Sequence, residues 1–385
     1  MKKTLLLSEI FPPVKGGSGR WFWEVYNRLP REKVVVAAGQ ANNAADFDAN
    51  SPLKTYRLSL SSLSWGLRSL IGLKFYWKAY WQVRKLVKEE SIEVIHCGRC
   101  LPEGFIAYLI KKTMGIPYIC YIHGEDVETA ATSRELTWIV HRALAGAEKL
   151  VCNSKNTADI VLNTWQAEPN KTHVVHPGVD ANYFVPAETD LAVRERLGWG
   201  ERPVIITVGR LQLRKGQDML IRSLPEIKAR FPDVLYAVIG EGEEKPNLVK
   251  LAQELGVAEN VAMMSELSDE QMLQCYQQCD LFVLPNRTIG CDIEGFGMVL
   301  VEAQACAKPV IAGDSGGTAE TMVIGKSGFV VDCTRPEPLA KEITELLENR
   351  EKRENMGNLG RQHVESSLDW SQLAEQARQL MLSVK

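Results

Sequence analysis

The sequence predicts an α/β protein of two domains, each a doubly wound parallel sheet with helices on both faces. The first observation is length, because 385 residues exceed the usual size of one compact core and favour two domains of roughly 150 to 200 residues. The second is a rhythm of short apolar runs between longer stretches of helical periodicity, which is typical of βαβ units. The third is that this rhythm stops near residues 180 to 200 and then restarts.

The first half begins with an apolar run at residues 3–7, which ends before Glu9. Because a signal peptide needs a longer apolar core, we interpret this run as a first buried strand. Further strands are expected where apolar runs recur, at residues 34–38, 94–97, 118–122 and 149–152. No stretch of about 18 uninterrupted apolar residues occurs, so the sequence predicts no membrane-spanning helix.

The second half restarts after a polar stretch that runs from Asp180 to Glu201. Its expected strands lie at residues 204–208, 235–239, 260–264, 281–284 and 309–312. We accordingly expect a Rossmann-like first domain over residues 1–180 and a Rossmann-like second domain over residues 181–367.

Charge and cysteine content exclude several classes of function. The formal charge is −3, from 45 basic and 48 acidic side chains, so the sequence has no overall electrostatic reason to bind nucleic acid. Nine cysteines in a chain of this length are interpreted as inert thiols kept reduced in the cytosol. We therefore expect a cytoplasmic protein, soluble or peripheral at the inner face of the membrane, and no metal site.

Glycine-rich loops follow several of the expected strands. In open α/β sheets, ligands bind beyond the carboxyl ends of the strands, where such loops and helix N-termini present backbone N–H groups. The clusters are Gly16-Gly17-Ser18-Gly19, Gly209, Gly240 with Gly242, Gly295 with Gly297, and Gly316-Gly317. Two domains with such loops indicate a cleft between them for a phosphorylated ligand.

The segment from Glu294 to Glu302 carries the strongest pattern, and we expect it to open a helix. On a helix the two carboxylates would stand about 12 Å apart, so that one can bind a sugar and the other a ribose. The N–H groups around Gly297 and Met298 would favour a phosphate at the helix N-terminus. The alternative is an amphipathic helix with two solvated glutamates, but Gly-Phe-Gly at a strand–helix junction favours a functional role.

Arg210 and Lys215 follow the expected strand at 204–208. A leaving diphosphate gains negative charge as a glycosidic bond breaks, and two fixed cations can neutralise it. The alternative is that these are solvated loop cations, which is our interpretation of Arg214.

The loop around Gly17 enters a helix at the end of the first strand. Glycines occupy positions 16, 17 and 19, so this is not the GxGxxG dinucleotide pattern. The loop is expected to lie near a phosphate or an acceptor, and the alternative is an ordinary turn.

His123 follows the expected strand at 118–122. A lone histidine at a strand end is more often structural than catalytic. Only the other motifs make a catalytic role attractive.

Residues 65–88 mix aromatic and basic side chains. Basic aromatic helices can lie on anionic membranes. We favour the ordinary alternative, a helix whose aromatic side chains pack into the core.

Taken together, these motifs resemble retaining glycosyltransferase family 4. Glu294 and Glu302 look like the E-x7-E motif of that family, and Arg210 with Lys215 looks like its diphosphate-binding pair. A finer similarity, to bacterial phosphatidylinositol mannosyltransferase-like members, lies in residues 285–288, 292–295, 301–306 and 315–320.

The resemblance implies a GT-B fold, in which two Rossmann-like domains face an interdomain cleft, and a metal-independent reaction that retains the anomeric configuration. It places His123 beside the reacting sugar. The final helix, residues 368–385, is expected to pack back on the first domain.

The resemblance also implies a donor site. Glu294 would contact donor-sugar hydroxyls and Glu302 the ribose. Arg210 and Lys215 would bind the diphosphate, and Gly17 would bind a phosphate through its amide.

The expected reaction transfers a hexosyl, in first place mannosyl, group from a nucleotide-diphosphate sugar to a lipid-linked or glycan acceptor in cell-surface polysaccharide or glycolipid synthesis. GDP-mannose is the favoured donor and a UDP-sugar the second, each a substrate rather than a cofactor. Because the sequence offers no clear carboxylate nucleophile, we favour same-face attack assisted by the leaving phosphate. The alternatives are a nucleotide-sugar epimerase and a non-catalytic nucleotide-sugar-binding scaffold.

Overall fold

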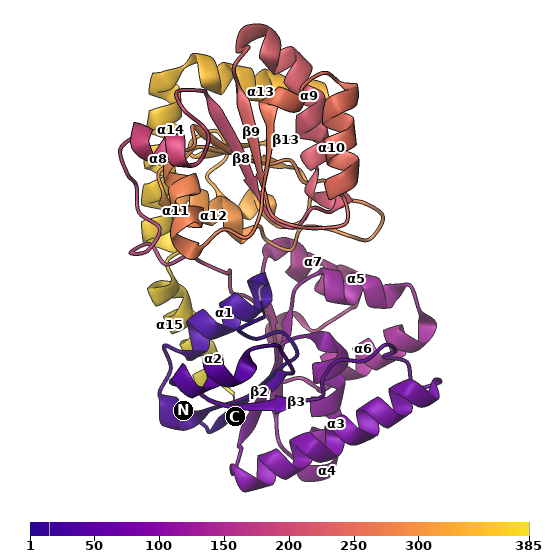
Figure 1. The fold of residues 1–385 in the computed structure, drawn as a ribbon. Coiled ribbons are helices and arrows are strands. Elements are labelled where there is room, and N and C mark those ends of the chain that lie inside the picture. Colours follow the sequence, from indigo (N-terminus) through magenta and orange to yellow (C-terminus); the bar gives the residue numbers. More distant parts are fainter. Residues whose placement is uncertain (15, 385) are drawn as a thin grey trace. The chain divides into compact units, whose positions relative to one another are not determined.

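The computed structural model describes residues 1–14 and 16–384, which form two compact units. The first unit comprises the chain up to Pro177 together with the segment from Trp370 onward. The second unit is Gly178–Asp369. In Figure 1 the first unit runs from indigo to purple, with the yellow C-terminal helix beside it, and the second from magenta to yellow.

Among the described residues, the first unit contains one parallel sheet of seven strands in the order β3-β2-β1-β4-β5-β6-β7. The strands are β1 (Thr4–Ser8), β2 (Val34–Gly39), β3 (Lys54–Leu58), β4 (Val94–Cys97), β5 (Tyr118–Ile122), β6 (Lys149–Cys152) and β7 (Thr172–Val174). The helices are α1 (Gly17–Tyr26), α2 (Ala44–Asn50), α3 (Leu70–Glu89), α4 (Phe105–Met114), α5 (Glu125–Ala131), α6 (Arg134–Gly146), α7 (Lys155–Asn163) and α15 (Trp370–Leu382). Helix α15 packs against α1, and α4 packs against both α3 and α6.

The second unit contains, within the described chain, a parallel sheet of six strands in the order β10-β9-β8-β11-β12-β13. The strands are β8 (Val204–Val208), β9 (Leu235–Ile239), β10 (Val261–Met264), β11 (Leu281–Leu284), β12 (Val310–Gly313) and β13 (Gly328–Val331). The helices are α8 (Leu191–Arg196), α9 (Gln217–Arg230), α10 (Lys245–Glu254), α11 (Asp269–Gln278), α12 (Met298–Ala305), α13 (Pro336–Glu348) and α14 (Arg350–Ser367).

Burial on both faces of each sheet explains why these segments fold as they do. In β8, Val204 and Ile206 belong to one apolar cluster, whereas Ile205 between them belongs to another. Successive side chains of a strand point to opposite faces, so the two clusters lie on the two sides of the sheet. Each buried aliphatic side chain stabilises the fold by about 1.5 to 3 kcal/mol relative to exposure.

The predicted fold class is confirmed: both units are doubly wound parallel sheets. Three strands were not predicted, namely β3, β7 and β13, and each lies at an edge of its sheet. An edge strand is covered less completely than a central one, so its sequence need not be a continuous apolar run. Lys54 at the start of β3 is exposed, which illustrates the difference.

Among the residues that the structure describes, no helix combines the length and apolar character that crossing a bilayer requires.

Candidate active site

The second unit brings two of the predicted site residues into contact at one edge of its sheet. Strands β8 and β11 pair in parallel, so the loops that follow them leave the same edge. Lys215 lies after β8, and Glu294 lies after β11. Lys215 Nζ is 2.5 Å from Glu294 Oε2, a direct ion pair.

Arg214 corrects our interpretation of a solvated loop cation. Its side chain is largely buried and binds two carboxylates, Asp292 Oδ1 at 2.9 Å and Glu294 Oε2 at 2.7 Å. The cause is a short 3₁₀ turn, Leu213–Lys215, which directs Arg214 as well as Lys215 toward Glu294. The structure thus adds Arg214 to the predicted cluster.

The Glu294 carboxylate is buried and ionised. Burial alone would raise the pKa of this carboxyl, but the charges of Lys215 and Arg214 lower it below its ordinary value. Both cations bind Oε2, and Oε1 makes no hydrogen bond to any residue that the structure describes. Oε1 is therefore available to accept a hydrogen bond from a ligand.

Glu294 does not lie on a helix, contrary to the expectation. Helix α12 begins at Met298, after Gly297 in a left-handed conformation with φ of 92°. The Glu294 carbonyl instead accepts a hydrogen bond of 2.9 Å from Gly317 N, so the glycine pair after β12 holds this segment. The axial spacing of about 12 Å calculated for a continuous helix therefore does not apply.

The N-terminus of α12 is open to an anion. No side chain caps Gly297, so the first N–H groups of the helix, beginning at Met298, lack a capping acceptor. The helix dipole adds partial positive charge at the same place. A phosphate is the kind of group that this terminus can bind.

Glu302 lies inside α12 and is buried. Tyr276 Oη, on α11, donates a hydrogen bond of 2.6 Å to Glu302 Oε2. This bond orients the carboxylate.

Arg210 is exposed, and its side chain forms no ion pair with a residue in the described ranges. Its backbone is held, because the Arg210 carbonyl accepts hydrogen bonds from Gln217 Nε2 and Gln212 N. The structure does not bring its guanidinium to Lys215 or Glu294. A fixed backbone with an unpaired guanidinium leaves this charge available for an anion.

In the first unit, His123 follows β5 and is buried. Its Nε2 lies 2.8 Å from the Gly98 carbonyl, which can only accept, so Nε2 carries the proton and Nδ1 does not. Burial lowers the pKa of His123 and keeps the ring neutral. The rings of Trp21 and Phe22 pack against it edge to face.

Gly17 is exposed and opens α1, and no side chain caps Gly16 before it. Its amide is therefore at a free helix N-terminus, as the predicted phosphate contact requires. Lys15 lies outside the described residues.

Glu103 is a buried residue of the first unit that the sequence did not single out. Its Oε1 accepts a hydrogen bond of 2.7 Å from Glu9 N, and its Oε2 has no partner among the described residues. Burial raises the pKa of Glu103 to about 7. Only its place two residues before the start of α4 could have indicated it, and that is a weak pattern.

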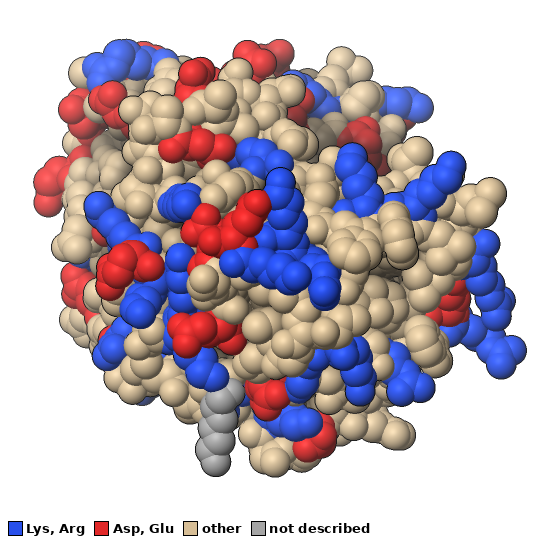
Figure 2. All heavy atoms as spheres, turned by 90° about the horizontal axis from the view of Figure 1, so that it is seen from below, with Lys and Arg blue, Asp and Glu red and all other residues tan. Residues whose placement is uncertain are grey.

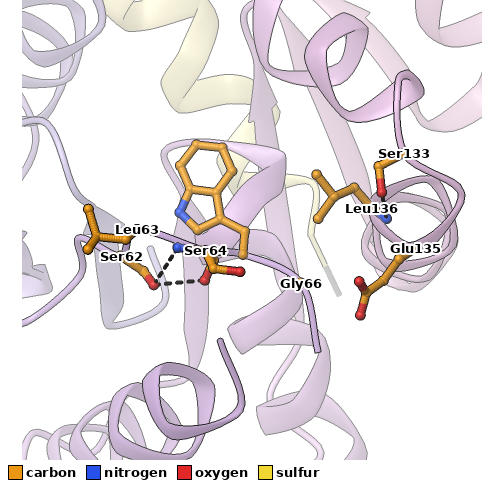
Figure 3. Close-up of a pocket in the computed structure, with 8 residues that line it drawn as sticks. Ser62, Leu63, Ser64, Gly66, Ser133, Glu135 and Leu136 are labelled. Atoms are coloured by element: carbon orange, nitrogen blue, oxygen red, sulfur yellow. Dashed lines mark hydrogen bonds between the residues drawn. The ribbon is translucent and has the colours of Figure 1, made fainter. Parts of the chain in front are cut away.

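An open hollow of about 490 Å³ lies in the first unit, and none of the predicted site residues lines it. Figure 3 shows Ser62 and Ser64 on one side and Ser133, Glu135 and Leu136 on the other. A hydrogen bond of 2.7 Å from Ser62 Oγ to the Ser64 carbonyl holds the loop. This hollow therefore does not support the predicted donor site.

The described residues contain no group of three or more side chains arranged to hold a metal ion. Asp46 and Asp48 stand at Asp-x-Asp spacing on α2, and Arg57 binds both carboxylate oxygens of Asp48. The nine cysteines are free thiols, and all but Cys291 are buried.

Comparison with known proteins identifies the family. Residues 15–183 match the family described as Glycosyltransferase Family 4, and residues 191–363 match Glycosyl transferases group 1. The chain is 30% identical to a GDP-mannose-dependent alpha-(1-6)-phosphatidylinositol monomannoside mannosyltransferase of Mycolicibacterium smegmatis, over 95% of this chain and 94% of the relative. A monoacylated-phosphatidylinositol-monomannoside counterpart from Corynebacterium glutamicum is also 30% identical, over 99% and 98% of the two chains.

The chain belongs to glycosyltransferase family 4.

Solved structures show the fold of this glycosyltransferase. Anabaena HepE in complex with UDP superimposes with a TM-score of 0.84 at 20% identity, over 99% of this chain and 100% of HepE. Sucrose-phosphate synthase from Thermosynechococcus elongatus gives 0.81 at 20% identity, over 99% and 98% of the chains. The glycosyltransferase therefore has the GT-B fold, as predicted.

Proposed function

We propose that this glycosyltransferase transfers a mannosyl group from GDP-mannose to a lipid-linked or glycan acceptor and retains the anomeric configuration. One observation carries the proposal: Arg214 and Lys215 hold Glu294 through Oε2 and leave Oε1 available. A buried, ionised oxygen is a strong acceptor for the hydroxyls of a sugar. Mannose as the sugar is supported by the GDP-mannose-dependent relatives.

A UDP-sugar is the second candidate donor. It is supported by the Anabaena structures with UDP and with UDP-glucose, although their similarity to this chain extends only to the fold. In either case the nucleotide sugar is a substrate, and the protein needs no separate cofactor.

The donor diphosphate would be neutralised by protein charge instead of a metal ion. As the glycosidic bond breaks, negative charge develops on the leaving diphosphate. Arg210, Lys215 and the uncapped N-terminus of α12 would stabilise this charge. Glu302, oriented by Tyr276, would accept hydrogen bonds from the ribose.

Same-face attack fits these residues better than a double displacement does. A carboxylate that two cations hold is less basic, so Glu294 suits hydrogen bonding more than nucleophilic attack. The acceptor hydroxyl would then give its proton to an oxygen of the leaving phosphate. His123, held neutral with an unprotonated Nδ1, would accept a hydrogen bond from a sugar hydroxyl.

The proposal is tested by incubating the purified protein with GDP-mannose and a bacterial lipid extract, with a chelator present. We expect a mannosylated lipid whose linkage, measured by NMR, has the α configuration of the donor. Glu294→Ala should abolish the product without unfolding the protein. A β-linked product would contradict retention, and transfer from UDP-glucose alone would contradict the mannosyl donor.

The same assay separates the two rival functions. A nucleotide-sugar epimerase would change the donor sugar with no acceptor present. A scaffold would bind the donor and give no product with any acceptor, and Glu294→Ala and Lys215→Ala would leave glycan synthesis in cells unchanged.

A further inference from the structure

Helix α3 has two apolar faces, only one of which is buried in the first unit. Phe75, Tyr76 and Val83 pack into the core, as we expected of the aromatic segment. The opposite face does not pack: Trp77 is 68% exposed and Trp81 48% exposed. Our preference for simple core packing was therefore right for only part of this helix.

The exposed apolar side chains form a continuous ridge. Leu70, Leu73, Trp77 and Trp81 follow one another at intervals of three or four residues, so they lie along one side of the helix over about 16 Å. The two indole rings contact each other at 5.7 Å between centroids. Contiguous exposed apolar surface of this kind marks an interaction site, whereas single exposed side chains do not.

A loop extends the ridge beyond the start of α3. Leu63 is 97% exposed, at the rim of the hollow shown in Figure 3. Ile71, at the start of the helix, is also exposed.

The charged side chains that α3 itself contributes are all basic until its last residue, Glu89, whereas Glu135 of α6 lines the hollow beside Leu63. Lys74, Lys78 and Lys85 are exposed, and Arg84 lies 5.6 Å from the Trp81 ring. From Leu70 to Lys88 the helix contains no acidic residue. Figure 2, which views the molecule from below, shows many Lys and Arg side chains on this face, with groups of Asp and Glu and areas of uncharged surface between them.

We propose that this ridge, Leu63 together with the exposed face of α3, docks the protein on the surface of an anionic lipid bilayer. Tryptophan prefers the interface between headgroups and acyl chains, and leucine adds buried apolar area. Lysines beside the ridge reach anionic headgroups while their alkyl stems stay on the apolar surface.

A second copy of the chain fits this surface less well. A symmetric pair would bring the same lysines of both copies against each other, and like charges across an interface oppose binding. A bilayer of negative headgroups satisfies the charge and the apolar side chains together. The inference deepens the lipid-linked branch of the proposed function, because it would bring the enzyme to its acceptor.

The test measures co-sedimentation of the full protein with vesicles. We expect binding to vesicles of phosphatidylcholine with phosphatidylglycerol, weakened by salt, and little binding to phosphatidylcholine alone. Lys74→Glu with Lys78→Glu should weaken binding at least about 30-fold, because each surface lysine contributes roughly a fivefold gain. Trp77→Ser with Trp81→Ser should abolish it.

The matched control is Lys326→Glu with Lys341→Glu, which makes the same change of net charge with exposed lysines of the second unit. This control should bind like the wild type, and all variants should keep the wild-type melting temperature. Slow GDP release from GDP-mannose in solution should persist in the tryptophan variant, which separates a failure of docking from a failure of the proposed function.

Two results would overturn the docking surface. One is wild-type protein that does not bind anionic vesicles at low salt. The other is a Trp77→Ser, Trp81→Ser variant that binds anionic vesicles as the wild type does. If light scattering then shows that this variant has changed from dimer to monomer, a second copy of the chain is the partner of the ridge.

Discussion

Arg214 and Lys215 share one oxygen of Glu294, and this arrangement decides which atoms remain available to a ligand. The pair sits on a turn 80 and 79 residues before Glu294 in sequence, so the contact depends entirely on the parallel pairing of β8 with β11. Arg214 also reaches Asp292. In the proposed function Arg214 would act on the sugar only through Glu294, which makes it a positioning residue.

Arg214→Gln tests this role. Losing one of two cations should raise the pKa of Glu294, so the acid limb of the pH profile of kcat/KM should move to higher pH. Loss of a hydrogen bond to a charged group costs about 1.5 to 3 kcal/mol, which predicts a fall in kcat/KM of roughly 10- to 100-fold. Arg214→Lys, which keeps the charge, should recover most of the activity. An acid limb at the same pH in wild type and Arg214→Gln would contradict the role.

Glu103 predicts how stability depends on pH. Burial raises its pKa from 4.5 to about 7, so the folded protein holds a proton that the unfolded chain releases above pH 4.5. The stability gained from this proton is fully present below about pH 4.5 and is lost as pH rises through 7, by at most about 1.4 kcal/mol per pH unit. Glu103→Gln mimics the protonated acid. Its melting temperature should therefore fall less between pH 5 and 8 than that of the wild type.

Other groups titrate in the same pH range. The effect of Glu103 is therefore the difference between the melting temperatures of wild type and Glu103→Gln at each pH. If the melting temperatures of wild type and Glu103→Gln fall in parallel between pH 5 and 8, Glu103 is ionised in the folded protein over that whole range.

At the scale of elements, the site depends on glycines that let strand-end loops approach one another. Gly216 ends the turn that carries Arg214 and Lys215, with φ of 73°. A Cβ built there would lie 1.8 Å from the Pro285 carbonyl oxygen, just after β11. Backbone cannot move away as a flexible side chain can, so only glycine fits.

Gly216→Ala and Gly256→Ala form a matched pair. Gly256 also has a positive φ, of 66°, but a Cβ there would meet nothing within 4 Å. Gly256→Ala should therefore cost only about 1 to 2 kcal/mol of backbone strain, measured by urea unfolding. Gly216→Ala adds a clash with backbone and should cost several kcal/mol more and abolish donor binding. Equal costs would mean that the loop after β8 can relax away from Pro285.

Burial determines which strands could be predicted from the sequence. Central strands such as β5 and β8 are covered on both faces, so their continuous apolar runs predicted them to the residue. The edge strand β3 is only partly buried along its length and has no continuous apolar run, so it was missed. The start of α12 was placed too early. The helix begins only after Gly297, whose left-handed conformation cannot be recognised from the spacing of apolar residues.

The candidate site was predictable where a motif is local and unpredictable where it is not. The spacing of Glu294 and Glu302 is visible in the sequence. The ion pair from Arg214 to Glu294 and the burial of Glu103 arise from contacts between distant segments, so composition and spacing do not reveal them.

At the scale of the whole molecule, family and structure divide the chain in the same way. The two family matches, residues 15–183 and 191–363, fall largely within the two compact units, each of which has its own sheet and core. The charge of −3 is unevenly distributed, because the exposed face of α3 is basic. Net charge therefore says little about the partners of either unit.

The central claim is that the cluster at Glu294 binds a GDP-sugar without a metal ion. Its most direct test is thermal stability of the wild type with GDP-mannose, UDP-glucose and ADP-glucose in a chelator, with Lys215→Ala as the variant that removes the cation. We predict that GDP-mannose raises the melting temperature, with about 2.7 kcal/mol of stabilisation at 100 times its Kd. Lys215→Ala should lose this response. Stabilisation by UDP-glucose alone, or by no donor until a divalent metal is added, would contradict the claim.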